Sequence, residues 1–480
     1  MSGTKRSRRD FLKTIGGVGT GLAVAQLGAA ALPLPSNSAT YLGGFIAPKL
    51  DLIKIAIIGC GSRSGTHQNH LSSFEGTEIV GLCDLYPDLT EKAKARVLRQ
   101  GKGERHLGVK LYSGDPDIYK TMLAETKPDL VYVVTPWATH AAMCIDAMKA
   151  GAHVCSEVPL TTSLEESWKL IETAERTQKH CMMLENVNYG REELLYLNLC
   201  RQGVLGELLH GEAAYIHDLR GQMRHVERGR GTGSWRTAHW AQENGNLYPT
   251  HGLGPVAQYM NIARTEDNFR RLVSFSSPAR NHELYAKKHL KADSPVNQIN
   301  FSAGGDMNTS VIKTMLGRTI MVQWDESSPR PYSRLNLIQG TKGTAAGFPN
   351  RIALDYGKGD GLPEALFSAL AGKKNHTNSH HWHNNLAAFY AAYEHPLYTR
   401  VGAMARKLGG HGGMDAIMNF RVIECIRTGQ PLDQNLYEGC LWSAVTPLSR
   451  KSVAEDGMPQ DFPDFTRGNW KTTAPLGIIG

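Results

Sequence analysis

The chain has 480 residues, of which 41% are hydrophobic and 20% charged, so it is long enough to bury two domain cores. Its formal net charge at pH 7 is +8, but half of that charge lies between residues 5 and 13. The remainder shows no basic stripe with interleaved aromatic residues, which excludes a typical nucleic-acid-binding protein. Eight cysteines are scattered without a close-spaced pair, so their spacing does not predict disulfides.

Residues 1–40 are predicted to be an export signal followed by a linker. The segment Ser7-Arg8-Arg9-Asp10-Phe11-Leu12-Lys13 resembles the twin-arginine signal and precedes a Gly- and Ala-rich, mildly apolar stretch, Thr14 to Leu34. This stretch has too few Leu, Ile and Phe residues to favour a membrane anchor, although an uncleaved anchor is the alternative. We therefore expect the protein to use the twin-arginine export machinery and to be periplasmic or otherwise exported, without a stable anchor. That machinery carries folded proteins, so a cofactor would be captured before export.

The stretch from Lys54 to Asp84 predicts the opening of a dinucleotide-binding βαβ unit. A short β-branched run over 55–58 leads into the glycine-rich loop Gly59–Gly65, and a second strand over 78–83 ends at Asp84. The glycines let backbone N–H groups approach a pyrophosphate at the start of the following helix. A carboxylate at Asp84 can accept hydrogen bonds from both ribose hydroxyls and would repel a 2′-phosphate. The sequence therefore predicts NAD rather than NADP.

Strands and helices alternate regularly up to Asn186, which predicts a doubly wound parallel sheet, a Rossmann-type domain over residues 50–186. Ligands collect at the carboxyl ends of the strands in such sheets. The candidate cofactor-binding residues lie in the glycine loop and at these strand ends: Gly59, Gly61, Ser62, Arg63, Asp84, Thr135, Pro136, Trp137, Ala138, Glu157, Val158 and Asn186.

From residue 187 to 480 the pattern changes to a second, α+β domain with a C-terminal tail. Its open sheet is predicted to be mostly antiparallel, with one face covering the nicotinamide. The strand predicted over Glu207–Asp218 carries Tyr215 and His217, which are two residues apart and therefore share one face. From the strand pattern alone, these two residues are an amphipathic tyrosine and a surface histidine.

The N-terminal motifs resemble the glucose–fructose oxidoreductase/inositol dehydrogenase superfamily. That superfamily usually has Glu-Lys-Pro after the fifth strand, with a catalytic lysine, whereas this chain has Glu157-Val158-Pro159. Valine cannot donate a proton, so the resemblance does not imply ordinary sugar dehydrogenation by that lysine.

Longer motifs are similar to those of glycoside hydrolase family 109, which contains NAD-dependent α-N-acetylgalactosaminidases. The resemblance runs from about residue 52 to 470 and is carried by Glu185-Asn186-Val187-Asn188-Tyr189, Gly206-Glu207-Leu208-Leu209-His210-Gly211, Tyr215-Ile216-His217-Asp218-Leu219-Arg220, Trp235-Arg236-Thr237, Leu247-Tyr248-Pro249-Thr250-His251-Gly252, Arg330-Pro331-Tyr332 and Gly410-His411-Gly412-Gly413-Met414-Asp415. It implies a retaining glycosidase that uses bound NAD, an exception to the usual pair of carboxylates.

This resemblance implies a chemistry in which C3 of the sugar is oxidised, a base removes the C2 proton, the leaving group is eliminated, and water addition and reduction follow. It implies Tyr215 and His217 as the catalytic pair, with His217 assisting a tyrosine whose ordinary pKa is near 10. The substrate-binding residues that it implies are Tyr215, Arg236, Tyr248, Pro249, Thr250, His251 and Tyr332.

Two other functions remain as alternatives: a periplasmic NAD-dependent sugar or polyol dehydrogenase, and a sugar-binding protein that keeps NAD only structurally. His376, His380, His381 and His383 form a cluster, but no Cys, Asp or Glu falls close by, so no metal is predicted. The role of His411 stays open between a helix start and the site. The partner is predicted to be a glycan or glycoconjugate, with its natural identity and a homo-oligomeric state left open.

Overall fold

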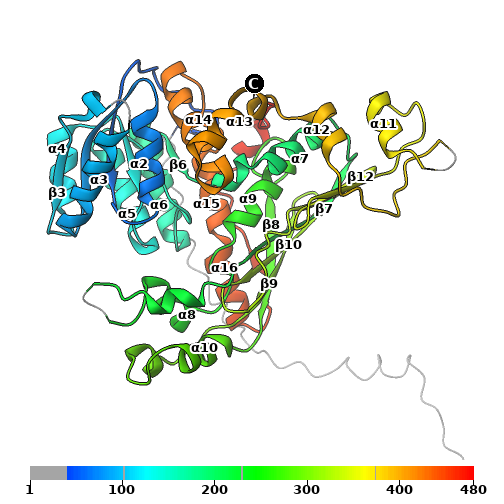
Figure 1. The fold of residues 1–480 in the computed structure, drawn as a ribbon. Helices are drawn as coiled ribbons and strands as arrows, with labels where there is room; N and C mark the ends of the chain where they lie inside the picture. The colour runs from blue at the N-terminus through cyan, green and yellow to red at the C-terminus, as the bar shows by residue number, and fades with distance from the viewer. Residues whose placement is uncertain (1–39, 101–102, 229–230, 373–374, 480) are drawn as a thin grey trace, which may run out of the picture. The chain divides into compact units, whose positions relative to one another are not determined.

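The computed structural model describes residues 40–100, 103–228, 231–372 and 375–479. The predicted twin-arginine signal, over residues 1–39, lies outside these ranges. Within them, no helix is both long and apolar enough to cross a bilayer. Two sheets and the helices packed on them make up the described part of the chain (Figure 1).

Sheet A is a six-stranded parallel sheet in the order β3-β2-β1-β4-β5-β6, which confirms the predicted doubly wound architecture. Its strands are β1 (Ile53–Ile58), β2 (Thr77–Asp84), β3 (Lys110–Ser113), β4 (Leu130–Val133), β5 (His153–Ser156) and β6 (Cys181–Met183). The helices between them are α2 (Ser64–Ser73), α3 (Pro87–Arg99), α4 (Ile118–Thr126), α5 (His140–Lys149) and α6 (Leu164–Thr177).

The apolar run of β1 is buried on both faces because successive side chains enter two different cores. Ile55 and Ile57 pack in a core with residues of α2, α3 and α14 (Met414–Thr428). Ala56 and Ile58 belong to the other core, which includes residues of α4, α5 and α6. The C-terminal helix α14 therefore returns to cover the N-terminal sheet, and Figure 1 shows it beside α2.

Sheet B has eight strands in the order β13-β12-β11-β7-β10-β9-β8-β14. They are β7 (Leu208–Ile216), β8 (Phe269–Ser276), β9 (Asn308–Thr314), β10 (Thr319–Asp325), β11 (Leu337–Gly340), β12 (Gly343–Ala346), β13 (Arg351–Leu354) and β14 (Gln460–Asp461). Only the β7–β10 pair is parallel among these described strands, so the prediction of a mostly antiparallel sheet is confirmed.

The remaining helices lie mostly on or around sheet B. They are α7 (Arg191–Arg201), α8 (Trp235–Gln242), α9 (Thr250–Tyr259), α10 (Asn281–His289), α11 (Glu364–Leu370), α12 (Ala387–Tyr393), α13 (Pro396–Leu408), α15 (Leu436–Ser443) and α16 (Val445–Ala454). Short 3₁₀ turns are η1 (Gly103–His106), η2 (Trp137–Thr139), η3 (Asn186–Tyr189), η4 (Arg220–Arg224), η5 (Pro295–Gln298), η6 (His411–Gly413) and η7 (Asn469–Thr472).

Helix α9 lies directly on β7, and a glycine makes this close approach possible. A Cβ on Gly252 would lie 2.3 Å from the backbone nitrogen of Ala214, so no larger residue fits there without moving the helix. The contact places the first turn of α9 beside the end of β7. Residues at the start of α9 and at the carboxyl end of β7 therefore lie close together.

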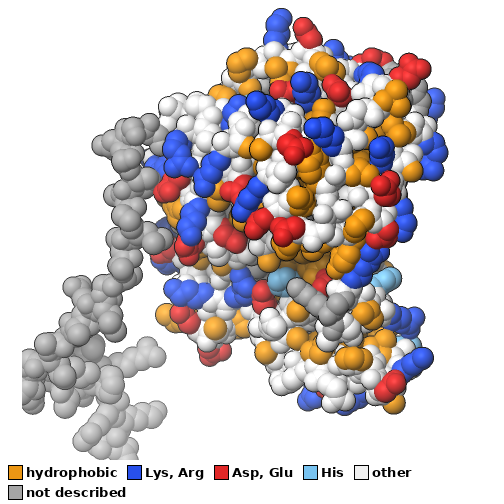
Figure 2. Space-filling model, turned by 90° about the vertical axis from the view of Figure 1, so that its left-hand side faces the viewer, with side chains coloured by type: hydrophobic (Ala, Val, Ile, Leu, Met, Phe, Trp, Pro, Cys, Tyr) orange, Lys and Arg blue, Asp and Glu red, His pale blue; other side chains and the backbone are white. Residues whose placement is uncertain are grey.

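All eight cysteines fall in the described residues and are free thiols. Seven of them are buried, including Cys83, Cys155 and Cys181 in strands of sheet A. Cys144 lies against Cys181, and this contact together with burial raises the pKa of the Cys181 thiol well above its ordinary value. Figure 2 shows Lys and Arg interspersed with Asp and Glu on the face that it presents.

Candidate active site

The glycine-rich loop between β1 and α2 has a backbone that only glycine can follow at its first position. Gly59 has φ +93°, and a Cβ there would lie 2.2 Å from the carbonyl oxygen of Val134. At Gly61, by contrast, an added Cβ would meet nothing within 4 Å, so open space lies beside the loop where a pyrophosphate would bind.

Asp84 is the last residue of β2, and its carboxylate is hydrogen-bonded to the glycine-rich loop. One carboxylate oxygen accepts a hydrogen bond from the backbone N–H of Cys60 at 2.8 Å, and the other accepts one from Tyr86 at 3.1 Å. Each carboxylate oxygen can accept more than one hydrogen bond, and the side chain is only half-buried. The open loop and this acid fit the adenosine half of NAD.

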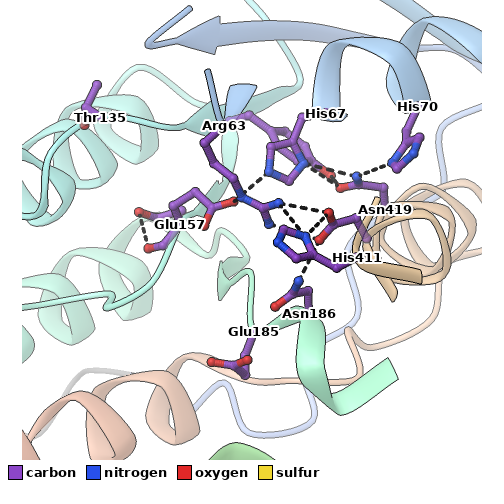
Figure 3. Close-up of polar contacts among 12 residues, drawn as sticks. Arg63, His67, His70, Thr135, Glu157, Glu185, Asn186, His411 and Asn419 are labelled. Atoms are coloured by element: carbon purple, nitrogen blue, oxygen red, sulfur yellow. Dashed lines mark hydrogen bonds and ion pairs between the residues drawn. The ribbon is translucent and has the colours of Figure 1, made fainter. Parts of the chain in front are cut away.

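Arg63, in the same loop, joins a network of buried charges (Figure 3). Its Nε donates to Glu157 at 2.6 Å, and its two terminal nitrogens donate to the carboxylate of Asp415 at 2.9 and 3.0 Å. Asn186 Nδ2 donates to Asp415 at 2.8 Å, and His411 Nδ1 pairs with it at 2.7 Å. The network thus brings three predicted cofactor-binding residues together with Asp415, an acid that stands in a quoted motif but received no role from the sequence.

The two carboxylates in this network are ionised in spite of their burial. Burial works to raise the pKa of Glu157, but Arg63 and His67 outweigh it and lower that pKa to about 2. Burial likewise opposes ionisation of Asp415, and the hydrogen bonds from His411 and Arg63 hold its pKa well below the usual range. Removing one partner would therefore leave a buried charge without compensation.

Trp137 links the Rossmann part of the site to the second sheet. It follows Thr135 and Pro136 at the end of β4, and Ala138 continues the same turn. Its ring lies 4.7 Å from the ring of Trp235 and 5.5 Å from that of Tyr248. Among the other predicted cofactor residues, Val158 is buried, and Ser62 is exposed in the loop.

Tyr215 and His217 lie at the carboxyl end of β7 and are hydrogen-bonded to each other. The distance from Tyr215 Oη to His217 Nδ1 is 3.0 Å, so the shared face predicted from their spacing is confirmed. Burial raises the pKa of Tyr215, while Arg236 works in the opposite direction. Burial lowers the pKa of His217. Both groups are therefore neutral near pH 7, as a protonated tyrosine beside an unprotonated imidazole.

Arg236, at the start of α8, is held by a buried carboxylate and a set of rings. Its Nη1 donates to Glu326 at 2.6 Å, and the indole N–H of Trp240 donates to the other oxygen of Glu326 at 2.8 Å. The guanidinium carbon lies about 5 Å from the rings of Trp137, Trp235 and Tyr248. Such a cation–π arrangement fixes the arginine in one orientation.

The first turn of α9 supplies His251, whose imidazole pairs with a buried acid at the end of β6. Nδ1 of His251 donates to Glu185 Oε1 at 2.7 Å, and the Tyr248 hydroxyl lies 3.4 Å from its Nε2. Glu185 is fully buried, and its second oxygen has no hydrogen-bond partner in the described protein. Thr250, next to Pro249 at the helix start, is also buried with a hydroxyl that has no such partner. Both atoms lie beside His251 at the start of α9.

Tyr332 also lies near the catalytic pair, because its neighbour Ser333 pairs with Ile216, the residue after Tyr215. Its ring centroid lies 5.0 Å from that of His217 and 6.2 Å from that of Tyr215. All the predicted substrate-binding residues therefore meet around the end of β7. The His376–His383 cluster lies elsewhere, and no group of three or more potential metal ligands occurs in the described ranges.

Three acids of this site were not predicted from the sequence. Glu185 stands in a quoted motif beside Asn186 but received no role, although an acid at the end of a buried strand is itself a signal. Glu326 and Asp415 lie 90 and 352 residues from the arginines that they bind. No spacing pattern in the sequence connects such distant pairs.

The fold and the site together define the class of protein. It has two sheets and a Rossmann domain that binds NAD. A family model described as the NAD-binding Rossmann fold of an oxidoreductase family matches residues 53–185, and one described as the C-terminal domain of glycosyl hydrolase 109 matches residues 189–472. The chain belongs to glycosyl hydrolase family 109. It is therefore an NAD-using glycoside hydrolase, as the sequence motifs predict.

Relatives and solved structures agree with this assignment. Glycosyl hydrolase family 109 protein 1 of Akkermansia muciniphila is 52% identical and covers 98% of this chain and 99% of the relative. The family 109 protein of Shewanella pealeana is 47% identical, covering 99% of this chain and 100% of the relative. A levoglucosan dehydrogenase in complex with NADH shares the fold, with a TM-score of 0.61 and 17% identity, over 86% of this chain and 99% of that one.

Proposed function

We propose that this glycoside hydrolase removes terminal α-N-acetylgalactosaminyl residues from glycans or glycoconjugates, with retention at the anomeric carbon. The observation that carries the proposal is the hydrogen-bonded pair of Tyr215 and His217 at the carboxyl end of β7. This pair provides the proton transfer that an elimination from C2 needs. A pair of carboxylates is not required for that route.

The proton steps follow from the neutral forms of the pair. In the neutral tautomer of His217 that carries its proton on Nε2, Nδ1 accepts a hydrogen bond from the Tyr215 hydroxyl. The tyrosine can then take the C2 proton while its own proton passes to Nδ1. The reverse transfer returns a proton to C2 when water has added. Because burial disfavours a tyrosinate, this concerted relay explains how a tyrosine acts as a base near neutral pH.

The remaining substrate groups are proposed to bind and orient the sugar. Arg236 presents N–H donors to sugar oxygens, and Tyr248 and Tyr332 offer rings and hydroxyls. His251, with Nδ1 held by Glu185, directs Nε2 toward the Tyr248 hydroxyl and can exchange a proton with a sugar hydroxyl there. Pro249 and Thr250 set the start of the helix that carries His251.

The proposed cofactor residues divide between the two halves of NAD. The pyrophosphate and ribose are bound by Gly59, Gly61, Ser62 and Asp84. The residues nearer to the sugar site are Thr135, Pro136, Trp137, Ala138, Glu157, Val158 and Asn186. Arg63 lies between these two groups. When bound, NAD supplies the oxidation and later the reduction of C3, which makes the C2 proton acidic. The rings of Trp137 and Tyr248 lie about 5 Å from the Arg236 guanidinium and help to hold it in one orientation.

Assays in deuterated water and with C2-deuterated substrate test this function against the alternative, an NAD-dependent sugar or polyol dehydrogenase. Purified enzyme without added NAD should cleave a chromogenic α-N-acetylgalactosaminide and release sugar with deuterium at C2. A dehydrogenase would leave C2 unlabelled, show no isotope effect with C2-deuterated substrate, and accumulate NADH. That combined result would overturn the glycosidase mechanism.

We further propose that the protein is exported by the twin-arginine route, with residues 1–40 as signal and linker, 50–186 as NAD domain and 187–480 as substrate domain. The support is the motif around Arg8 and Arg9 and a cofactor site that must be filled before export.

A further inference from the structure

Two exposed aromatic rings adjoin the catalytic pair through successive ring contacts. Tyr332 is 40% exposed and Phe348 is 36% exposed. The centroid of the Tyr332 ring lies 5.0 Å from that of His217 and 5.6 Å from that of Phe348. The catalytic tyrosine is buried, whereas these two rings reach solvent. We call Tyr332 and Phe348 the ring platform.

The backbone beneath the ring platform is strained. Leu335, Asn336 and Phe348 have φ of +57°, +51° and +52°, a left-handed conformation that is rare for bulky residues. They lie against one another, because the N–H of Gly347 donates to the carbonyl oxygens of Leu335 and Asn336 at 2.9 and 3.1 Å. Strain of this kind persists where the surrounding structure enforces it, and it gathers at ligand-binding sites.

A buried acid, Glu193, enforces this geometry. Its Oε1 accepts hydrogen bonds from Arg334 at 2.7 Å and from Asn336 at 3.2 Å. Arg334 in turn donates to the Tyr332 hydroxyl at 2.9 Å, and its guanidinium lies 5.5 Å from the Tyr332 ring and 4.8 Å from the Phe348 ring. Arg334, which is bound to Glu193, therefore lies against both rings and restricts the movement of the ring platform.

We propose that the ring platform is a binding site for the sugar that precedes the released residue, so that the enzyme prefers oligosaccharides to simple glycosides. This inference rests on the proposed function. The terminal sugar occupies the buried end at Tyr215, and the rest of the glycan leaves past Tyr332. A flat, preorganised ring packs against the C–H face of a pyranose, and its rigidity lowers the entropy lost on binding. Phe348 is thus a specificity-determining residue.

The test compares two substrates with the same terminal α-N-acetylgalactosaminyl residue, the methyl glycoside and a trisaccharide, on NAD-loaded enzyme. Chromogenic aryl glycosides are avoided because their own ring would occupy the platform. Phe348→Ala should lower the ratio of kcat/KM for the trisaccharide to that for the methyl glycoside by about 3- to 10-fold, the effect of one aromatic contact. Phe348→Tyr, which keeps the ring, should restore the ratio.

A matched control is Phe275→Ala, because Phe275 is 58% exposed on β8, away from the Tyr215 pair in the sheet order. It should leave the ratio at the wild-type value. If Phe348→Ala lowers both substrates equally, the ring only supports Tyr332, and if it changes neither, no sugar stacks there; both results overturn the inference. Failure of the wild type to cleave either substrate would instead contradict the proposed function.

Discussion

Tyr215 and His217 are held in the protonation states that the proposed relay needs, and this makes the pair testable one atom at a time. Tyr215→Phe keeps the ring and its packing but removes the hydroxyl. We expect kcat to fall by about 10²- to 10⁴-fold, the usual effect of losing a positioned acid–base group. NAD content should be unchanged.

The control for this substitution is Tyr196→Phe, which also removes a buried hydroxyl, one that donates to the carbonyl oxygen of Ala346. It should lower stability slightly without a comparable loss of kcat. Near-normal turnover of Tyr215→Phe would assign the base to another residue, and His217 would be tested next.

The pH dependence follows from the direction of the His217 shift. Because burial lowers the pKa of His217, the imidazole stays able to accept a proton at pH values below the ordinary value of about 6.5. The acid limb of kcat/KM should therefore have its midpoint below that value, where protonation of His217 stops the relay. Unfolding measured at the same pH values separates this limb from acid denaturation. A midpoint above the ordinary histidine value would contradict the assignment.

At the scale of elements, α14 and the turn before it act on the cofactor loop of a distant strand. Asp415 binds Arg63 through two nitrogens, so Asp415→Asn should weaken the hold on the loop. We expect NAD to dissociate about 10- to 100-fold faster, because hydrogen bonds to charged groups contribute about 1.5–3 kcal/mol. The measurement is NAD retained after dialysis.

Asp433→Asn is the matched control, because Asp433 forms a buried pair with Arg421 of the same helix at 2.8 Å, away from the loop. It should destabilise the protein but leave NAD retention unchanged. Equal loss of NAD in both variants would mean that retention follows stability rather than the Arg63 contact.

The same helix shows which parts were predictable from sequence. Local patterns predicted the strand–loop–helix opening and the alternation up to Asn186. They did not indicate that α14 covers sheet A, because that packing joins residues some 350 positions apart. The strand predicted over 207–218 is β7 (Leu208–Ile216), an interior strand that is largely buried at its carboxyl end because α9 packs on its face and neighbouring strands pair with both of its edges.

At the scale of the whole molecule, the cofactor is restored in each cycle, so purified protein should carry NAD. Denaturing the protein and assaying the supernatant for nucleotide measures this directly. Asp84→Ala should lower NAD affinity about 10-fold or more, since the carboxylate both supports the loop and accepts charge-assisted bonds from ribose. Fully active protein that contains no nucleotide would refute the internal redox mechanism.

Export is tested by replacing Arg8 and Arg9 with lysine. The variant should accumulate in the cytoplasm, folded and active, because the proposed site residues all lie in the described part of the chain. Fractionation followed by activity assay gives the distribution. Appearance of the variant in the periplasm at the wild-type level would exclude the twin-arginine route.

The buried thiols of Cys144 and Cys181 have a consequence for whether the protein folds before or after the proposed export. In an unfolded chain these sulfurs would be open to oxidation on arrival in an oxidising compartment, and wrong bridges would trap the chain. In the native fold both thiols are buried in the core, and the raised pKa of Cys181 keeps that thiol from the reactive thiolate form. Under the proposed export route, a protein that has already folded in this way would need no disulfide isomerase after it crosses the membrane.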